Sequence, residues 1–430
     1  MSKRVSFRTL GCKLNFAETS SLAAKFEQRG FVRIDEFENS DIIIINTCSV
    51  TSLAEKKGRN ILSKARRSNP GAKIVVLGCY AQLHPGELAH LNSADLILGN
   101  EEKFKIFDYL DEQQHSKIHT HPFKEITTFD NAWSSSDRTR TFLKVQDGCS
   151  YFCAYCTIPM ARGLSRSPRI EDVVKSVHDI IATGTREIIL TGVNVGDFGR
   201  EHNQTFTELL QALVEIENLP RLRLSSIEPN LMTDDIIQLV ASSEKLMPHF
   251  HIPLQCGTNE MLSKMNRRYT VETFAGRIEK IKSAIPDACI AADVIVGVPG
   301  ETDEHHHRAL EFIKSLNLSY LHVFTYSSRP GTKAAEMEGQ VNAQVKQQRS
   351  REMHELADKL SRKFLEKHLK TNRKVLFEKE IKDGYIYGFT DNYIRVKTHY
   401  TKGMENTILT VYLSEIDKEG HIKGDIYDKI

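Results

Sequence analysis

Short apolar runs that alternate with helix-like stretches are the feature that most constrains the fold of this 430-residue chain. Near the N-terminus, strand-like runs such as DIIIINTCSVT and AKIVVLGCYAQ are separated by helical stretches at 15–30, 52–68, 85–91 and 101–114. Buried strands bounded by turn residues and separated by helices are typical of parallel α/β sheets. The N-terminal part is therefore predicted to form an open parallel α/β sheet.

A second series of strand–helix units follows. We expect its strands at TFLKVQDGC, REIILTGVNV, RLRLSSIEP, HFHIPLQC, ACIAADVIVGVPG and YLHVFTYSS. Six units are two short of a closed (βα)₈ barrel. The pattern predicts a partial (βα)₆ TIM-like barrel, whose lateral opening would suit a large substrate.

After this barrel, a long basic helix leads into short strands with turn residues between them, which predict a small all-β barrel. A chain of this length is too long for a single ordinary core. The fold class is α/β, and we expect five segments: an N-terminal domain at 1–115, a linker at 116–137, the partial barrel at 138–340, the basic helix at 341–370 and the small β-barrel at 371–430.

The N-terminal stretch MSKRVSFRTLGCKLN lacks the apolar core of a signal peptide, and no apolar run approaches the length of a membrane helix. These features predict a cytoplasmic protein without a membrane partner. Because cytoplasmic thiols stay reduced, disulfides are an improbable use for its cysteines.

Three cysteines, Cys149, Cys153 and Cys156, lie within eight positions at the end of the first expected barrel strand, where barrel active sites are built. A structural zinc site needs a fourth ligand, and a redox dithiol needs only two cysteines. Three thiolates would instead hold a 4Fe-4S cluster with one iron left open for a small molecule. Three buried packing thiols are the alternative.

Three further cysteines, Cys12, Cys48 and Cys79, each end an expected parallel strand of the N-terminal sheet. Strand carboxyl ends lie along one edge of such a sheet, which is where ligands bind. We expect the three thiols to hold a second cluster, although they can also be unrelated buried cysteines. Cys256 and Cys289 have no partner pattern and are expected to be core fillers.

The segment QDGCSYFCAYCTIPMARG resembles the signature of the radical S-adenosylmethionine (SAM) enzymes. The resemblance implies that the open iron binds SAM, whose reductive cleavage gives a 5′-deoxyadenosyl radical. It also places Tyr155, directly before the third cysteine, among the cofactor-binding residues.

The two triads together resemble the methylthiotransferase branch of that superfamily, nearly from end to end. The matching segments are GCKLN, NTCSVT, LGCYAQ, HIPLQCGTNEMLSKMNRRYT, DVIVGVPGETDE and FTYSSRPGTKAA. The C-terminal barrel resembles the TRAM module, an RNA-binding fold. The branch commonly has Ser where this chain has Cys256, so the resemblance assigns that thiol no role.

This resemblance implies two 4Fe-4S clusters and SAM as cofactors. The barrel cluster would generate the radical, the N-terminal cluster would supply sulfur, and a second SAM would supply the methyl group. QDGC and NTCSVT favour the branch that modifies C2 of N6-threonylcarbamoyladenosine beside the tRNA anticodon.

The expected partners are tRNA and a reductant such as flavodoxin or ferredoxin, and the expected state is a monomer. The alternatives are another modified tRNA adenosine, an aspartate of a small-subunit ribosomal protein, and a non-enzymatic, metal-stabilised RNA-binding protein.

Further candidate residues stand at expected strand ends. For SAM binding these are Gly192, Asn194, Glu228, Gln255 and Asp293, and for substrate phosphates Arg162 and Arg166, just past the barrel triad. A plain turn at Gly192 and solvated helix ends at the arginines are the alternative interpretations.

RNA contacts are expected from basic residues and aromatic rings. Basic residues dominate 55–73 and 341–374, which fits a phosphate-binding surface or two solvated helix faces. Tyr385, Tyr387 and Tyr393 are candidate stacking rings. The run His305–His307 opens a helix and is not expected to bind metal.

Overall fold

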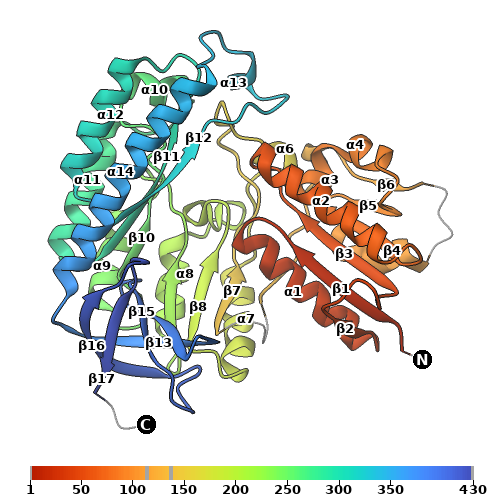
Figure 1. Cartoon of the computed structure of the whole chain (residues 1–430), viewed down its shortest axis with the longest axis horizontal. Helices are drawn as coiled ribbons and strands as arrows, with labels where there is room; N and C mark the ends of the chain where they lie inside the picture. Colours follow the sequence, from red (N-terminus) through yellow and green to blue (C-terminus); the bar gives the residue numbers. More distant parts are fainter. Residues whose placement is uncertain (1, 112–115, 135–138, 428–430) are drawn as a thin grey trace.

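The computed structural model describes residues 2–111, 116–134 and 139–427, and it contains an N-terminal α/β part, a central arc of strands and helices, and a C-terminal β-barrel (Figure 1). This arrangement confirms the α/β fold class. Of the helices described, none has the length and apolar character needed to cross a bilayer.

The N-terminal sheet has six parallel strands in the order β2-β1-β3-β4-β5-β6. Its strands are β1 (Arg4–Thr9), β2 (Val32–Ile34), β3 (Ile42–Thr47), β4 (Lys73–Gly78), β5 (Leu96–Leu98) and β6 (Ile118–His119). Its helices are α1 (Lys13–Gln28), α2 (Ser52–Ser68), α3 (Cys79–Leu83), α4 (Pro85–His90) and α5 (Ile106–Asp111).

Helices cover both faces of this sheet because alternate residues of each strand point to opposite sides. Ile42 and Ile44 pack in one core with residues of α1, whereas Ile43 and Ile45 pack in another with residues of α2. The α1 side also contacts the central arc, since Phe142 belongs to the same core.

Three sequence expectations for this part need correction. The strand ending in AKIVVLGCYAQ stops at Gly78, and Cys79 begins α3. The helix expected at 101–114 is a short 3₁₀ turn at Lys103–Lys105 followed by α5, with 112–114 outside the described residues. The expected linker contributes β6, and its Trp133 bridges to Leu143, while residues 115 and 135–137 lie outside the described part.

The central part confirms the six expected strands. They form two parallel three-stranded sheets, β7-β8-β9 and β10-β11-β12, which single bridges such as Ser226–His251 connect into one arc. The strands are β7 (Arg140–Lys144), β8 (Glu187–Thr191), β9 (Arg221–Leu224), β10 (His249–His251), β11 (Cys289–Val296) and β12 (Tyr320–Thr325).

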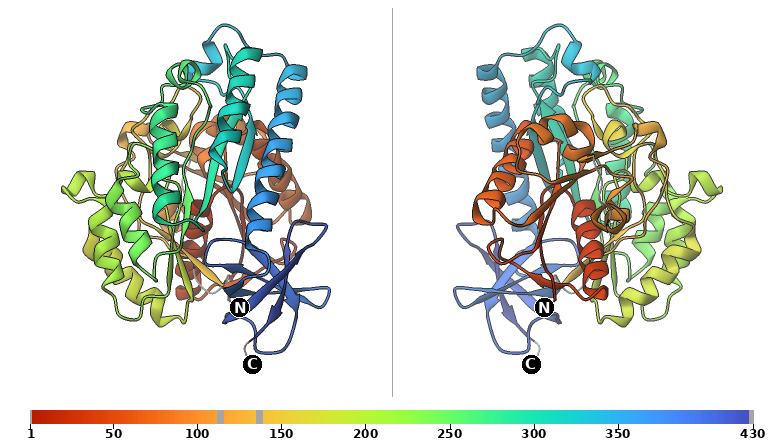
Figure 2. Two further views of the ribbon diagram at one scale, coloured as in Figure 1. Left: turned by 90° about the vertical axis from the view of Figure 1, so that its left-hand side faces the viewer. Right: turned by 90° about the vertical axis from the view of Figure 1, so that its right-hand side faces the viewer.

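Helices line the outside of this arc (Figure 2). They are α7 (Ile170–Ala182), α8 (Phe206–Val214), α9 (Asp234–Ser242), α10 (Asn259–Lys264), α11 (Val271–Ala284) and α12 (Asp303–Leu316). The short helix α6 (Ile158–Arg162) contacts α3 instead, and α13 (Lys333–Glu336) lies near the top of Figure 1. The expected basic helix is α14 (Ala343–His368), which packs along β12 and α12. It covers an arc edge that would otherwise be exposed.

The C-terminal strands close into a barrel of order β13-β14-β15-β17-β16. They are β13 (Asn372–Lys382), β14 (Tyr385–Thr390), β15 (Arg395–His399), β16 (Ile408–Ile416) and β17 (Ile422–Ile426); residues 428–430 of the expected segment are not described. The side chain of Arg223 in β9 donates hydrogen bonds to the carbonyl oxygens of Thr390 and Asp391. These bonds fasten the small barrel to the N-terminal ends of the arc strands.

Candidate active site

The barrel triad lies in the loop between β7 and α6, as its spacing predicts. Cys149 donates its backbone N–H to Gly163, and Cys156 donates its own to Cys153, so the loop folds back on itself. Burial raises the pKa of the Cys149 and Cys156 thiols to about 12, and neighbouring thiols of the triad add to both shifts. A cation bound between them would reverse this tendency and hold them as thiolates.

A cavity of about 300 Å³ opens directly beside these cysteines. Five of the six predicted cofactor residues line it: Tyr155, Asn194, Glu228, Gln255 and Asp293. The structure places the sixth, Gly192, against Gln146 instead, where an added Cβ would lie 2.8 Å from the Gln146 Oε1 atom. Gly192 therefore permits a close backbone turn and is not a lining residue.

The cavity wall offers a polar group that has no partner within the described residues. Asn194 Nδ2 is buried and without a hydrogen bond. Gln255 has a positive φ of 65°, a conformation that costs free energy for a side chain of its type and that clusters at functional sites. These features fit a cavity built for a polar ligand such as SAM.

Arg267 is a lining residue that sequence reasoning missed. Its Nη1 donates to the Cys153 Sγ atom at 3.0 Å, and its Nη2 pairs with the Glu228 carboxylate. Burial raises the pKa of Glu228, although the Arg267 guanidinium opposes the shift. The arginine lies four residues before the helix α11, in NRRYT, and only its folded position links it to the triad.

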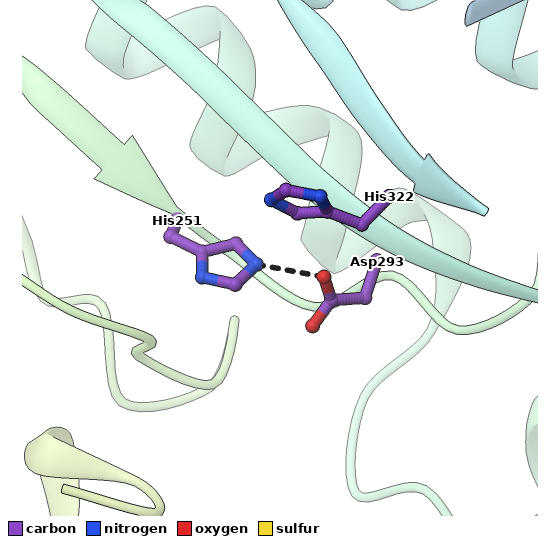
Figure 3. Close-up of side chains that lie close together, drawn as sticks. All are labelled: His251, Asp293 and His322. Carbon is purple, nitrogen blue, oxygen red and sulfur yellow. Dashed lines mark hydrogen bonds and ion pairs between the residues drawn. The ribbon is translucent and has the colours of Figure 1, made fainter. Parts of the chain in front are cut away.

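A polar cluster continues from the cavity along the inner face of the arc (Figure 3). His251 Nε2 and Asp293 Oδ1 form a 2.8 Å hydrogen bond, and the centroid of the His322 ring lies 5.4 Å from that of the His251 ring. One ligand atom from each of the three residues lies within 4.8 Å of the others. Asp293, predicted to bind the cofactor, lines the cavity, and two histidines lie beside it.

The N-terminal triad gathers at the carboxyl edge of the first sheet. Cys12 precedes α1, Cys48 follows β3 and Cys79 follows β4. A Cβ on Gly11, which has a φ of 104°, would lie 3.0 Å from the Cys48 sulfur, so only glycine permits this approach. Burial raises the pKa of Cys12, and it raises that of Cys48 to about 12, with the neighbouring thiols adding to both shifts.

Neither triad has the geometry of a single-ion site. Zn–S bonds of about 2.3 Å would place tetrahedral sulfurs roughly 4 Å apart. Among the described residues, the groups that bring three ligand atoms within 4.8 Å are His251–Asp293–His322 and Asp417–Glu419–His421, neither of which contains a cysteine. Thiols of each triad influence the pKa of their neighbours, but they lie farther apart than the ligands of a single ion. Such a spacing fits a larger iron–sulfur cluster.

Arg162 and Arg166 do not lie on a surface open to RNA, which corrects the predicted phosphate contacts. Arg162 is 1% exposed; its Nη1 donates to Asp147 at 2.8 Å and to Glu18 at 3.1 Å. Arg166 is also buried and pairs with Asp147. Both side chains belong to an ionic network between α1 and the barrel, and the Arg162 charge favours the thiolate forms of Cys12 and Cys48.

The cavity beside the barrel triad also reaches the N-terminal domain. Val50 and Thr51, which follow Cys48 in the sequence, line it together with the barrel cysteines, whereas Cys12, Cys48 and Cys79 are not among its lining residues. Arg329, in the loop after β12, holds the two domains together there by pairing with Glu55 and donating to Ser49.

The remaining candidates fall outside the cavity. Cys256 and Cys289 are buried core residues, as expected. His306 of the run His305–His307 pairs with Glu352 of α14 at 2.9 Å. Tyr393 is not a free stacking ring, because it packs against His249, with ring centroids 4.5 Å apart.

Two family models match the chain. One is described as the uncharacterized protein family UPF0004 and covers residues 4–99; the other is the radical SAM superfamily and covers residues 143–313. These ranges contain the N-terminal and barrel triads, respectively.

Curated relatives match almost the full chain. The threonylcarbamoyladenosine tRNA methylthiotransferase MtaB of Bacillus subtilis is 37% identical over 97% of this chain and 94% of its own length, and that of Thermotoga maritima is 34% identical over 98% and 96%. The tRNA-2-methylthio-N(6)-dimethylallyladenosine synthase of Endomicrobium trichonymphae is 34% identical over 97% and 98%.

Among solved structures, the radical S-adenosylmethionine methyltransferase TsrM from Kitasatospora setae matches with a TM-score of 0.57 at 14% identity, covering 78% of this chain and 77% of its own. The cobalamin-dependent radical enzyme OxsB matches with a TM-score of 0.52 at 12% identity, covering 83% and 56%. At these identities the likeness concerns the fold alone.

Proposed function

Because this chain belongs to the radical SAM methylthiotransferase family, we propose that it transfers a methylthio group to C2 of N6-threonylcarbamoyladenosine beside the anticodon of tRNA. The relatives named for that nucleoside match from end to end at 34–37% identity. The proposed reaction exchanges the C2–H bond of the base for a C2–S bond that carries a methyl group.

The observation that carries this proposal is that the cavity beside one cysteine triad extends to the segment that follows a cysteine of the other. Cys149, Cys153 and Cys156 border the cavity, and so do Val50 and Thr51, two and three residues after Cys48. A radical enzyme that only removes hydrogen needs one cluster. A base placed between two open irons can lose its hydrogen on one side and receive sulfur from the other.

When bound, the clusters and SAM supply the radical, the sulfur and the methyl group. The chain's own residues then have positioning tasks. Asn194 and Gln255 would offer amide groups to the methionine part of SAM, and Tyr155 and Asp293 border the same cavity. Arg267 contacts both Glu228 and Cys153, and so links this side of the cavity to the barrel triad.

Arg162 has the corresponding task at the other triad. It is a buried cation beside Cys12, Cys48 and Cys79, held in place by Glu18 and Asp147. Three thiolates carry negative charge into the interior, and a fixed guanidinium lowers the cost of that charge. It acts as a positioning residue, whereas a substrate contact would need an exposed side chain.

RNA would reach the cavity from the side of α2. The helix α2 is basic along its length and begins at Ser52, next to the lining residue Thr51. We assign the sulfur-delivering role to residues 1–115, the radical role to 138–340 and RNA binding to 371–430 together with the basic helix. A flavodoxin or ferredoxin would supply electrons to a monomeric enzyme.

The test is mass spectrometry of nucleosides from a synthetic anticodon stem-loop containing N6-threonylcarbamoyladenosine, after anaerobic incubation with reconstituted protein, SAM and reductant. We expect a methylthio group in place of one hydrogen. A product from a dimethylallyladenosine stem-loop alone, or from an aspartate peptide of the ribosome alone, would overturn the assignment in favour of those substrates.

A further inference from the structure

Three side chains with metal-binding atoms meet on the inner face of the arc, apart from both cysteine triads. His251 is the last residue of β10, Asp293 lies within β11 and His322 lies within β12. Figure 3 shows the three side chains converging on one another. The group contains no cysteine, so it does not belong to either proposed cluster.

The register of the parallel strands brings these side chains together. Asp293 and His322 are partners across β11 and β12, and His251 is the partner of Ala291, two residues before Asp293. Residues two apart on a strand point to the same face of the sheet. All three side chains therefore point to one side, and the pairing of the strands fixes their positions.

The ligand atoms lie at distances from which they can share one ion. One such atom from each residue lies within 4.8 Å of the others, and His251 Nε2 is 2.8 Å from Asp293 Oδ1. Tetrahedral Zn²⁺ with bonds of about 2.0–2.2 Å places its nitrogen and oxygen ligands roughly 3.4 Å apart. Small rotations of the three side chains would bring the atoms to that spacing.

Lone pairs remain free on two of the three residues. The hydrogen bond to His251 uses one carboxylate oxygen of Asp293, and Oδ2 has no hydrogen bond or ion pair within the described residues. In the same part of the chain, neither ring nitrogen of His322 has a hydrogen bond, although its ring centroid lies 5.1 Å from that of Tyr320. Imidazole nitrogens and carboxylate oxygens are common ligands of divalent zinc.

The other group of metal-binding side chains in the described part of the chain is Asp417, Glu419 and His421. Its residues lie in the short turn between β16 and β17, and the Lys397 ammonium already pairs with Asp417. This cation neutralises the carboxylate without a metal ion. The group on the arc has no such ammonium or guanidinium partner within the described residues, so the two groups can be compared directly.

We propose that His251, Asp293 and His322 bind one Zn²⁺ ion, at a site separate from the iron–sulfur clusters. Two histidines and one carboxylate suit both Zn²⁺ and Fe²⁺, and the general order of affinities places zinc above iron. Three protein ligands leave a fourth position. Water can occupy it, because His322 is exposed to solvent.

The ion would lie at the edge of the cavity beside the barrel triad, because Asp293 is one of the residues that line this cavity. There it would hold the Asp293 carboxylate in one orientation and add positive charge to the cavity wall. The site does not depend on the proposed function, since zinc binding requires neither tRNA nor SAM.

The experiment measures zinc on the cluster-loaded full-length protein, in which the cysteines of both triads are already occupied. After anaerobic reconstitution, the protein is dialysed against micromolar free Zn²⁺, and zinc and iron are counted in the same sample. Wild type should bind about one zinc ion per chain without losing iron. X-ray absorption at the zinc edge should show nitrogen and oxygen ligands at about 2.0–2.2 Å and no sulfur at about 2.3 Å.

His322→Gln tests the ligand set directly. Loss of a hydrogen-bond partner of a metal ligand weakens affinity about 10- to 100-fold, so loss of the ligand itself should weaken zinc binding roughly 100-fold or more. Because His322 is exposed, this variant should fold normally. Asp293→Asn should lose zinc as well, whereas His421→Gln, the matched control in the other group, should bind zinc as wild type does.

Three results would overturn the proposal. Wild type could retain no zinc, it could bind zinc through sulfur ligands alone, or both His322→Gln and Asp293→Asn could bind zinc as tightly as wild type does. An equal loss of zinc in His322→Gln and His421→Gln would also count against the site, because the two positions share no contact in the described structure.

Discussion

At the scale of single residues, the Arg267–Glu228 pair offers the most direct test. The Arg267 side chain is 2% exposed and contacts both Glu228 and the Cys153 sulfur. Arg267→Met should destabilise the protein by about 3–5 kcal/mol, because it leaves the Glu228 charge buried without its partner. Urea unfolding of the cluster-free protein measures this loss.

The double variant Arg267→Met/Glu228→Leu separates stability from function. Removing both charges should restore most of the stability, since an apolar pair of similar volume is tolerated in a buried position. Formation of 5′-deoxyadenosine should stay low, because Cys153 still lacks its donor. Recovery of SAM cleavage together with stability would show that Arg267 has a purely structural role.

Single residues also mark the limit of prediction from sequence. The barrel triad was predicted from its cysteine spacing and the N-terminal triad from three cysteines at the ends of expected strands, and the clusters that they would hold remain a prediction. Arg162 was misassigned to phosphate binding, since a basic residue in the sequence does not reveal whether it is buried. Its partner Glu18 lies 144 positions away, and only the packing of α1 on the barrel brings the two together.

At the scale of elements, the junction between α14 and the C-terminal barrel should respond to pH. His368 ends α14, and burial, with the Arg373 charge, lowers its pKa to about 4. In the unfolded chain the pKa of His368 is near 6.5. Between pH 6.5 and 4 the unfolded chain therefore binds a proton at His368 that the folded protein does not bind. The His368 contribution to stability is complete above pH 6.5 and falls by up to about 3 kcal/mol toward pH 4.

The measurement is the urea midpoint between pH 7 and 4.5 for wild type and His368→Gln. The variant should lose less stability than wild type over this range, because glutamine does not titrate. His354→Gln, an exposed histidine of the same helix, should behave like wild type. Parallel curves for wild type and His368→Gln would contradict the assignment.

The outer face of the C-terminal barrel carries a second element-scale prediction. Tyr385, Tyr387 and Phe389 alternate along β14 and lie opposite His399, Lys397 and Arg395 of β15. The Arg395 guanidinium stands 5.0 Å from the Tyr387 ring. Tyr387→Ala should weaken stem-loop binding by about 1–3 kcal/mol if a base stacks there.

Filter binding at fixed salt checks this value, with Tyr412→Ala on β16 as the control. Tyr412 is a half-buried ring on another strand, in contact with Tyr427. A loss of the same size in both variants would indicate a general effect on the barrel and no stacking site on β14.

Element boundaries were predicted well where local signals are strong. The helix α2 begins and ends where the sequence indicates, because Thr51 caps it by accepting a hydrogen bond from Ala54 N–H at 3.2 Å. The short strands β2 and β6 were missed, since three and two residues give no readable alternation. Cys79 was placed in a strand because CYAQ carries no cap signal.

At the scale of the whole molecule, the ion pair of Arg329 with Glu55 should decide whether the two triads can act in one reaction. Arg329 pairs with Glu55 across the domain interface, beside the cavity. Arg329→Met should leave 5′-deoxyadenosine formation intact but reduce methylthiolation, because the N-terminal triad is no longer held over the barrel. The measurement is the ratio of methylthiolated nucleoside to 5′-deoxyadenosine formed in one reaction.

Arg308→Met is the matched control, because it breaks the exposed pair with Glu260 at 2.8 Å. Surface pairs contribute about 0–1 kcal/mol, so this variant should keep the wild-type product ratio. A parallel fall of both products in Arg329→Met would indicate damage to the barrel site itself.

Counting strand–helix units predicted the architecture of each part, including the incomplete barrel. It did not predict how the parts dock, because docking depends on charges scattered along the chain. Glu18 and Arg223 each join segments that are remote in sequence.

The central claim is that two separate triads each hold a cluster, and iron and sulfide counting tests it most directly. After anaerobic reconstitution, wild type should hold roughly eight irons, and the Cys12/Cys48/Cys79→Ala and Cys149/Cys153/Cys156→Ala variants about four each. A wild type with only about four irons, all of them lost from the barrel variant, would contradict the account. The N-terminal cysteines would then hold no cluster, and the proposed source of sulfur would be wrong.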